Sequence, residues 1–124
     1  MKSIRFLKNI SNNTKLRLIS LLLENELCVC ELEEILHIRQ ANISKNLISL
    51  KDAGIVNVRR EKQRGFYSLT TDFLSNKHLV DYIKEQLQTE EILQKDYQEF
   101  LLHEEIKDNN IYVCNAYRKE EKND

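Results

Sequence analysis

Apolar residues recur every three or four positions along residues 4–23, which is the pattern of helices that bury one face. A turn-like stretch at residues 11–13 divides this segment into two short helices. Residues 26–29 favour an extended or irregular link, and residues 31–36 predict one more brief helix. The first third of the chain is therefore expected to be mainly helical.

The clearest helix follows a turn at residues 37–39. Ile43, Leu47 and Leu50 lie on one face, at spacings of four and three residues. Gly54 comes soon after them, where a helix commonly ends in the left-handed conformation that glycine adopts without strain. The spacing predicts a helix that starts near residue 40 and ends just before this glycine.

Beyond the glycine the pattern changes to that of strands. Residues 55–58 and 66–69 are rich in β-branched and aromatic side chains, and each predicts a strand. The polar residues 62–65 lie between them, and Gly65 is expected to turn the hairpin.

Helical spacing returns from about residue 74 to residue 102. The sequence Thr-Glu-Glu at residues 89–91 resembles a helix start, so this stretch predicts one helix or two. One apolar face is expected to run along it, formed by Leu79, Ile83, Leu87, Leu93, Tyr97 and Leu101. Residues 106–124 are mostly polar and are expected to form a disordered tail after a domain at residues 1–105.

The composition supports one small, mainly α domain. The chain has 124 residues, of which 41% are apolar, with two glycines and no proline. It leaves little room for a second core or a large active-site cleft, so an enzyme is not expected. No stretch approaches the roughly 18 to 20 consecutive apolar residues of a membrane span, and the first residues lack the apolar region of a secretory signal. These features predict a cytoplasmic protein that does not enter a membrane.

The charge of the chain is unevenly distributed. The formal net charge is -1, yet residues 37–67 hold seven basic and two acidic side chains, while residues 78–124 hold six basic and twelve acidic ones. A basic segment of this kind is an ordinary solvated surface or a nucleic-acid footprint. Its location over the clearest helix and the hairpin favours the second interpretation.

A brief helix, a turn, a longer helix and a basic hairpin follow one another in the order of a winged helix-turn-helix domain. The predicted fold class is therefore mainly α with a β-hairpin wing. The longer helix would present polar side chains to base edges, namely Gln40, Asn42, Ser44, Lys45, Asn46 and Ser49. The hairpin would present cations to phosphates or to a minor groove, namely Arg59, Arg60, Lys62 and Arg64.

The chain has three cysteines, which is too few and an odd number for a disulfide framework. Cys28 and Cys30 are two residues apart, and Cys114 lies in the polar tail. Residues i and i+2 of an α-helix point about 200° apart, so two such sulfurs reach one ion only if the helix start unwinds or bends. Because that helix precedes the predicted recognition helix, strain at the sulfurs would be transmitted to the DNA-binding face.

Three segments resemble the arsenical-resistance repressor (ArsR/SmtB) family of metalloregulators. They are Glu-Leu-Cys-Val-Cys-Glu-Leu at residues 26–32, Gln-Ala-Asn-Ile-Ser-Lys-Asn-Leu at residues 40–47 and Lys-Asp-Ala-Gly-Ile-Val at residues 51–56. The resemblance implies a homodimeric repressor that is released from operator DNA by a toxic metal or metalloid, with the first and last helices at the dimer interface. The recognition helix departs from the family, which commonly has Arg-His where Lys45-Asn46 stand.

The resemblance further implies arsenite, or antimonite, as the inducer. The family pattern has a third cysteine where Glu33 stands, so Cys28 and Cys30 form a site that is one thiolate short. Cys114 of the same or the partner subunit could complete it, or water or a small thiol could do so. Two buried, inert cysteines are the remaining interpretation.

Other functions are weighed against this one. A redox or persulfide switch would use the same cysteines, although a disulfide between residues i and i+2 is strained. A cadmium or lead site would need more cysteines, and the histidines lack the spacing of the family's zinc site. His37, His78 and His103 are therefore expected to be surface or packing residues, and the chain lacks the Cys-x-x-Cys spacing of a small thiol reductase.

Overall fold

The computed structural model describes residues 3–108, and residues 1–2 and 109–124 lie outside the described part. The two short helices predicted at the start are confirmed as α1 (Ser3–Ser11) and α2 (Asn13–Leu21). Asn12 caps α2, because its side-chain oxygen accepts the Lys15 N–H at 3.0 Å.

The helix-turn-helix is formed by α3 (Val29–Leu36) and α4 (Gln40–Asp52), and the short strand β1 (Leu27–Cys28) precedes it. Helix α3 starts two residues before the expected position. Cys28 is extended and serves as the N-cap, and its N–H donates to the Glu31 carboxylate at 3.2 Å, which satisfies one backbone group at the helix start.

Helix α4 ends as the sequence predicted. Gly54 has a φ of 76°, and the next amide, that of Ile55, donates to the Leu50 carbonyl at 2.9 Å. This is the Schellman arrangement, in which a left-handed residue closes the last turn.

The wing is a hairpin of β2 (Val56–Glu61) and β3 (Arg64–Leu69), and β1 extends it to a three-stranded antiparallel sheet in the order β1-β3-β2. The two predicted strands are confirmed. The extended link expected at residues 26–29 contains β1, but its place in the sheet was not predicted, because two residues are too few to show a period.

The hairpin turns at Lys62 and Gln63, not at Gly65 as expected. Lys62 takes the positive φ of 56° that this class of tight turn requires, and Gly65 pairs with Arg60 inside the sheet. A Cβ at Gly65 would lie 3.1 Å from Val58 Cγ2 and 3.2 Å from an Arg60 nitrogen. A larger residue at this position would therefore require the Val58 and Arg60 side chains to shift by a few tenths of an ångström.

The C-terminal part contains α5 (Thr71–Leu74), α6 (Lys77–Thr89) and α7 (Glu91–Asp108). The predicted helix start at residues 89–91 is confirmed, because the chain becomes extended at Glu90. Residues 106–108 belong to α7 rather than to a polar tail, and the rest of the predicted tail lies outside the described residues.

The prediction of one apolar face along both helices was wrong. Ile83 of α6 and Leu93 of α7 are buried, but Tyr97 and Leu101 are about half exposed. The break before α7 resets the helical phase, and its buried stripe is instead Leu93, Asp96, Phe100 and His103.

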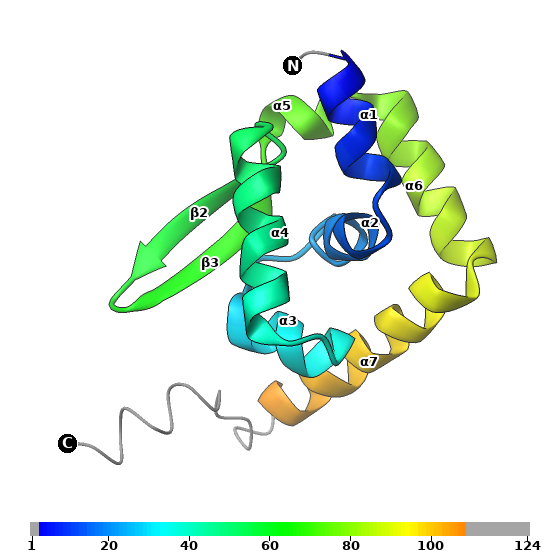
Figure 1. The fold of residues 1–124 in the computed structure, drawn as a ribbon. Helices are drawn as coiled ribbons and strands as arrows, with labels where there is room; N and C mark the ends of the chain where they lie inside the picture. The colour runs from blue at the N-terminus through cyan, green and yellow to red at the C-terminus, as the bar shows by residue number, and fades with distance from the viewer. Residues whose placement is uncertain (1–2, 109–124) are drawn as a thin grey trace.

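The core surrounds α2, which is seen nearly end-on in the middle of Figure 1 with α4, α6 and α7 around it. Leu18 and Ile19 of α2 are completely buried among leucine, isoleucine and phenylalanine side chains of the helix-turn-helix and α5. None of the helices in residues 3–108 combines the length and apolar character needed to cross a bilayer. The predicted winged helix-turn-helix fold, mainly α with a β-hairpin wing, is confirmed.

Candidate nucleic-acid interface and thiol site

The outer face of α4 carries the polar side chains that the sequence singled out. Gln40, Asn42 and Lys45 are exposed. Asn46 is half-buried and donates to Asn42 Oδ1 at 2.9 Å, so this amide pair is already oriented. Ser44 is also half-buried.

Ser49 is directed elsewhere. Its hydroxyl donates to Asn9 Oδ1 of α1 at 3.2 Å, and the Asn9 side chain is buried. This hydrogen bond fixes the packing of α4 on α1. Ser49 is therefore a weaker candidate for a base contact than the other five polar side chains.

Ile48 is a surface residue that the sequence reasoning missed. It is 59% exposed in the middle of α4, three residues after Lys45 and on the same side of the helix. An apolar side chain at this place can contact the methyl group of thymine. The signal was an isoleucine outside the buried stripe of a helix whose other outward residues are polar.

The four basic residues of the wing differ in their surroundings. Arg60 and Lys62 are exposed. Arg59 is tied to its own sheet: its guanidinium lies 2.7 Å from Glu26 and 2.7 Å from Glu61, and 4.8 Å from the centre of the Phe66 ring. The two carboxylates raise the pKa of Arg59.

The two candidate sulfur ligands lie beside the middle of the wing, where Cys28 pairs with Phe66 of β3. Cys28 and Cys30 form a small buried cluster with Phe66. Cys28 pairs with Phe66 across β1 and β3, and Phe66 pairs with Arg59 across β3 and β2, so these three side chains share one face of the sheet.

Arg64, the fourth cation of the wing, contacts the sulfur of Cys28. Its Nη2 donates to Cys28 Sγ at 3.2 Å, and its guanidinium also lies 5.3 Å from the centre of the Phe66 ring. Cys28 is a buried free cysteine, whereas Cys30 is disulfide-bonded. Cys114, the third predicted ligand, lies outside the described residues.

The expected geometry of the cysteine pair needs a correction. Only Cys30 lies within α3, because Cys28 is the extended N-cap residue. From their spacing, both cysteines were expected in one regular helix. The two cysteines instead lie on either side of the boundary between β1 and α3.

Glu31 is the buried polar centre beside these cysteines. One carboxylate oxygen accepts the Cys28 N–H, and the other, Oε2, lies 2.8 Å from His103 Nε2 and 2.8 Å from Lys107 Nζ. Burial raises the pKa of Glu31, but the hydrogen bonds and the charge of Lys107 outweigh it, and the pKa falls to about 2.

Within residues 3–108, Glu31, His103 and Glu104 form the one group of three or more His, Cys, Asp or Glu side chains close enough to share an ion. The Lys107 ammonium lies 2.8 Å from Glu31 and 3.7 Å from Glu104, so a cation of the chain already stands there. We therefore interpret the group as an ion-pair network. His103 packs inside it, and His37 and His78 are exposed, in agreement with the sequence.

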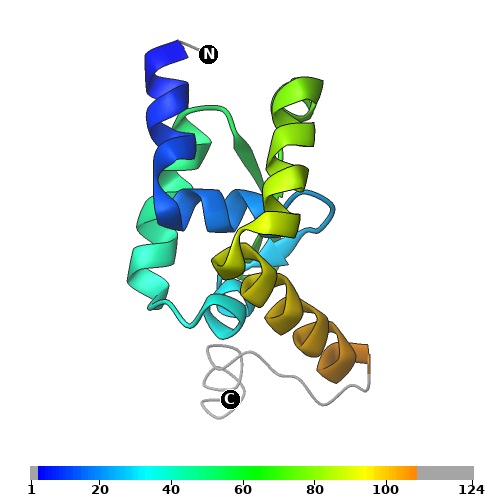
Figure 2. The same ribbon diagram turned by 90° about the vertical axis from the view of Figure 1, so that its right-hand side faces the viewer.

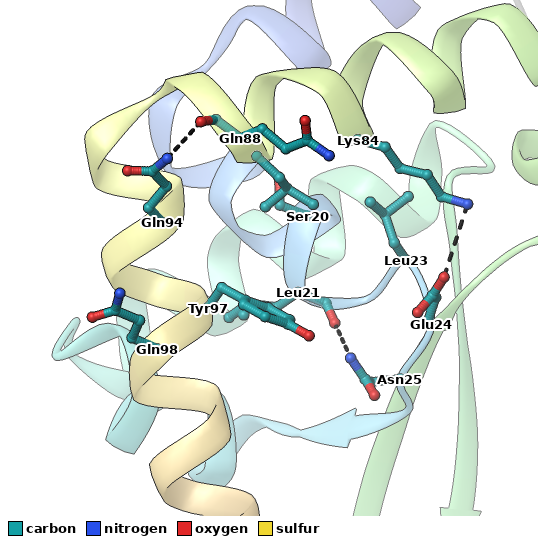
Figure 3. A pocket seen from close by; sticks show the side chains of 11 residues that line it. Ser20, Leu21, Leu23, Glu24, Asn25, Lys84, Gln88, Gln94, Tyr97 and Gln98 are labelled. Carbon is teal, nitrogen blue, oxygen red and sulfur yellow. Dashed lines mark hydrogen bonds and ion pairs between the residues drawn. The ribbon is translucent and has the colours of Figure 1, made fainter.

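A cavity of about 520 Å³ lies away from the cysteines, between the end of α2, α6 and α7 (Figure 3). Leu21, Leu23 and Tyr97 form part of its wall, and Lys84 faces Glu24 at its edge with 3.8 Å between the charged atoms. None of the predicted site residues lines it. The cavity is thus separate from both the α4 face and the sulfur cluster.

Comparison with known proteins agrees with this geometry. Residues 12–58 match the family model described as bacterial regulatory protein, arsR family. The transcriptional activator HlyU of Vibrio cholerae is 39% identical over 70 residues, which are 56% of this chain and 65% of HlyU. The chain thus spans just under two thirds of that relative.

The HlyU structure superposes with a TM-score of 0.60 and 33% identity, covering 67% of this chain and 88% of that one. A second HlyU structure, described as the reduced protein, superposes with a TM-score of 0.60 and 31% identity, covering 71% of this chain and 87% of that one. The Mycobacterium bovis fragment Mb0332 is described as a homodimeric winged helix-turn-helix DNA-binding domain. It superposes with a TM-score of 0.60 and 27% identity, covering 68% of this chain and 79% of that one.

The arsenical resistance operon repressor of Staphylococcus xylosus is 33% identical over 81 residues, which are 65% of this chain and 72% of the repressor. The family model ends inside β2, so it contains α3, the cysteine pair and α4. The relatives named here are transcriptional regulators. The chain belongs to the arsR family of bacterial regulatory proteins.

Proposed function

We propose that the chain is a cytoplasmic transcriptional repressor that binds operator DNA as a homodimer and is released when arsenite, or antimonite, binds the thiolates of Cys28 and Cys30. Helix α4 would lie in the major groove, with Gln40, Asn42, Lys45 and Ile48 toward the bases. Arg60 and Lys62 would contact phosphates. The arsenical resistance repressor among the relatives supports this inducer.

The observation that carries the proposal is the place of the sulfurs. Cys28 and Cys30 share one buried cluster directly before the first helix of the helix-turn-helix, and Arg64 of the wing donates to Cys28 Sγ. Thiolate sulfurs bind soft, thiophilic ions, and both candidate sulfurs lie in this one cluster. The donor set therefore fits a soft thiophile in the reduced protein.

The same contacts give a route from the sulfurs to the DNA-binding surface. Moving Cys28 toward Cys30 disturbs its pairing with Phe66 in the sheet and its backbone hydrogen bond to Glu31 at the start of α3. Helix α3 packs on α4, so both the recognition helix and the wing are affected. A coupling of about 1 to 3 kcal/mol would weaken DNA binding by roughly 5- to 150-fold.

Dimerisation is proposed from exposed apolar side chains at the N-terminal and C-terminal helices. Ile4 and Leu7 of α1 are 74% and 57% exposed, and Tyr82 of α6 is 58% exposed. In Figure 2, α1 and α6 both extend beyond α2. Two subunits would place their α4 helices in successive major grooves, about one helical turn of DNA apart.

The proposal is tested with a labelled duplex that the reduced protein itself selects from a random-sequence pool. Fluorescence anisotropy measures binding in a phosphine reductant, because a dithiol reductant would compete for arsenite. We expect arsenite to release the wild-type protein, and Cys28→Ser and Cys30→Ser to remain bound. Failure of the reduced wild-type protein to bind any duplex would refute the proposal, and so would binding that arsenite leaves intact.

The third ligand has its own variant. Cys114→Ser should require more arsenite for release if the tail cysteine completes a three-thiolate site. An unchanged response would leave a two-thiolate site completed by water or a small thiol.

The wing cations should contribute unequally to the salt dependence of DNA binding. We expect Arg60→Ser to lower the slope of log affinity against log salt concentration by about 0.9, the value for one lost phosphate contact. Arg59→Ser should change the slope less, because Glu26 and Glu61 already neutralise Arg59. Anisotropy titrations at several salt concentrations give both slopes, and equal slopes for the two variants would contradict this assignment.

Ile48→Ser should separate folding from DNA binding. Because the side chain is exposed, we expect the unfolding free energy to change by less than about 0.5 kcal/mol. Binding to the selected duplex should weaken by roughly 5- to 10-fold if Ile48 contacts a thymine methyl, since base contacts are worth about 1 to 3 kcal/mol. Replacing that thymine by uracil in the duplex should produce the same loss with the wild-type protein and none with the variant.

A second candidate function is a thiol redox switch. The disulfide state of Cys30 favours it, because that sulfur cannot bind an ion until it is reduced. In the same anisotropy assay, release by a mild oxidant without arsenite, reversed by the phosphine, would support this candidate. Release by arsenite under continuous reduction would support the inducer proposed above.

A further inference from the structure

Helix α7 is joined to the cysteine segment through one buried carboxylate. Here the cysteine segment means residues 27–31, which comprise β1 and the first turn of α3. Helix α7 packs against α3, and Glu31 and His103 at their contact are 1% and 5% exposed. The contact therefore lies inside the protein, next to the sulfurs.

The two oxygens of Glu31 hold different parts of the chain. Oε1 accepts the Cys28 N–H at 3.2 Å, and Oε2 lies 2.8 Å from both His103 Nε2 and Lys107 Nζ. His103 and Lys107 are four residues apart, so they lie one above the other on α7. Glu31 thus links the Cys28 backbone to α7 through hydrogen bonds at both of its oxygens.

This arrangement resists a rearrangement of the helix start. If Cys28 moves with the first turn of α3, Glu31 must either release the Cys28 amide or leave its partners on α7. If Glu31 left these partners, its carboxylate would remain buried without a compensating charge, which is unfavourable. The network therefore favours the conformation in which α3 starts at Val29.

We propose that His103 and Lys107 are positioning residues for the effector site: by holding Glu31 they hold Cys28 at the start of α3, and so set how much effector is needed to release DNA. This inference rests on the proposed function. A contact that favours the effector-free conformation lowers the apparent effector affinity by the same factor by which it favours that conformation. Weakening it makes the protein respond to less effector.

The test compares variants at two of the ion pairs that connect α7 to the rest of the protein. Lys107→Met removes the charge that touches Glu31 and keeps the apolar stem. Asp96→Asn weakens the other pair, between Asp96 and Arg17 of α2, which does not touch Glu31. Arsenite-induced release from the selected duplex is measured by anisotropy in a phosphine reductant, and arsenite binding is followed in parallel by the near-ultraviolet absorption of arsenic–thiolate bonds.

We expect Lys107→Met to lower the arsenite midpoint by about fivefold in both measurements, at the lower end of ordinary coupling factors. Asp96→Asn should keep the wild-type midpoint, and Lys107→Arg should restore it. Equal shifts for Lys107→Met and Asp96→Asn would mean that α7 acts only as a structural support, and they would overturn the inference, as would an unchanged or raised midpoint in Lys107→Met.

His103→Gln, which keeps a hydrogen-bonding side chain, replaces Lys107→Met if that variant does not fold, with the same expected direction. The proposed function and this inference fail in different ways. A wild-type protein that does not bind DNA or ignores arsenite contradicts the function. If the wild-type protein responds to arsenite but these variants keep the wild-type midpoint, only the role of α7 is contradicted.

Discussion

Acidification from about pH 5 to about pH 2 is expected to remove up to about 3 kcal/mol of unfolding free energy through Glu31 alone. The pKa of Glu31 is about 2 in the folded protein, against 4.5 for an unperturbed glutamate. A carboxyl group whose pKa is lowered by folding stabilises the protein above its unfolded pKa, and this contribution is lost as the pH falls toward the folded pKa. The figure follows from about 1.4 kcal/mol for each tenfold change in proton affinity.

Urea unfolding at a series of pH values measures this effect, and Glu31→Gln provides the comparison. The variant keeps the shape of the side chain but cannot titrate, so the stability difference between wild type and variant should shrink as the pH falls below about 4.5. Other acidic groups contribute equally to both proteins and cancel. If the difference is the same at about pH 6 and about pH 3, the assignment of Glu31 as a buried, paired carboxylate is wrong.

Replacing Arg17 by methionine is the second change with a large expected effect. The guanidinium binds Asp96 through two hydrogen bonds of 2.8 and 2.9 Å, and the Asp96 side chain is 4% exposed. Arg17→Met leaves this carboxylate buried without its cation, which is expected to destabilise the protein by about 3 to 5 kcal/mol. Chemical denaturation at neutral pH measures the loss.

Two further variants show whether the loss comes from the orphaned charge. Arg17→Met combined with Asp96→Leu should recover most of the stability, because a buried ion pair replaced by apolar side chains is often neutral. Arg59→Met, which breaks an exposed pair with Glu26, should have a much smaller effect than Arg17→Met. A double variant no more stable than Arg17→Met would point to packing by the arginine stem instead.

The sequence predicted the parts of the fold that depend on local pattern. Ile43, Leu47 and Leu50 define α4 by spacing alone, and all three are completely buried. Gly54 marked the end of that helix because a left-handed residue is needed there. The cysteine pair was found in the same way, since its two members are neighbours in the chain.

The parts that escaped prediction depend on contacts between distant residues. Glu31 and His103 are 72 positions apart, so nothing near either of them shows that they meet. A weak signal existed in α7, where Leu93, Asp96, Phe100, His103 and Lys107 follow alternating spacings of three and four. Three polar residues in that stripe hid it from a search for apolar faces, although they mark ion pairs with α2 and α3.

Residue type alone could not predict the surroundings of the cations on the wing. Arg59 and Arg60 are adjacent in the sequence, but alternate residues of a strand point to opposite faces. Arg59 therefore meets Glu26 and Phe66, while Arg60 lies opposite Gly65 at the exposed end of the hairpin. The pairing register, which the sequence did not supply, decides which arginine forms ion pairs with Glu26 and Glu61.

The ion pairs that α7 makes with α2 and α3 also limit how the protein can be shortened or recombined. A version cut after Thr89 would retain Arg17 and Glu31 but lose their partners Asp96, His103 and Lys107, and it would uncover the faces of α2 and α3 that pack against α7. A chimera carrying the terminal helix of another regulator would bury these two charges without partners, unless that helix supplies matching charges or positions 17 and 31 are made neutral. Helix α7 is therefore an essential part of the folded domain, and protein engineering cannot simply remove it.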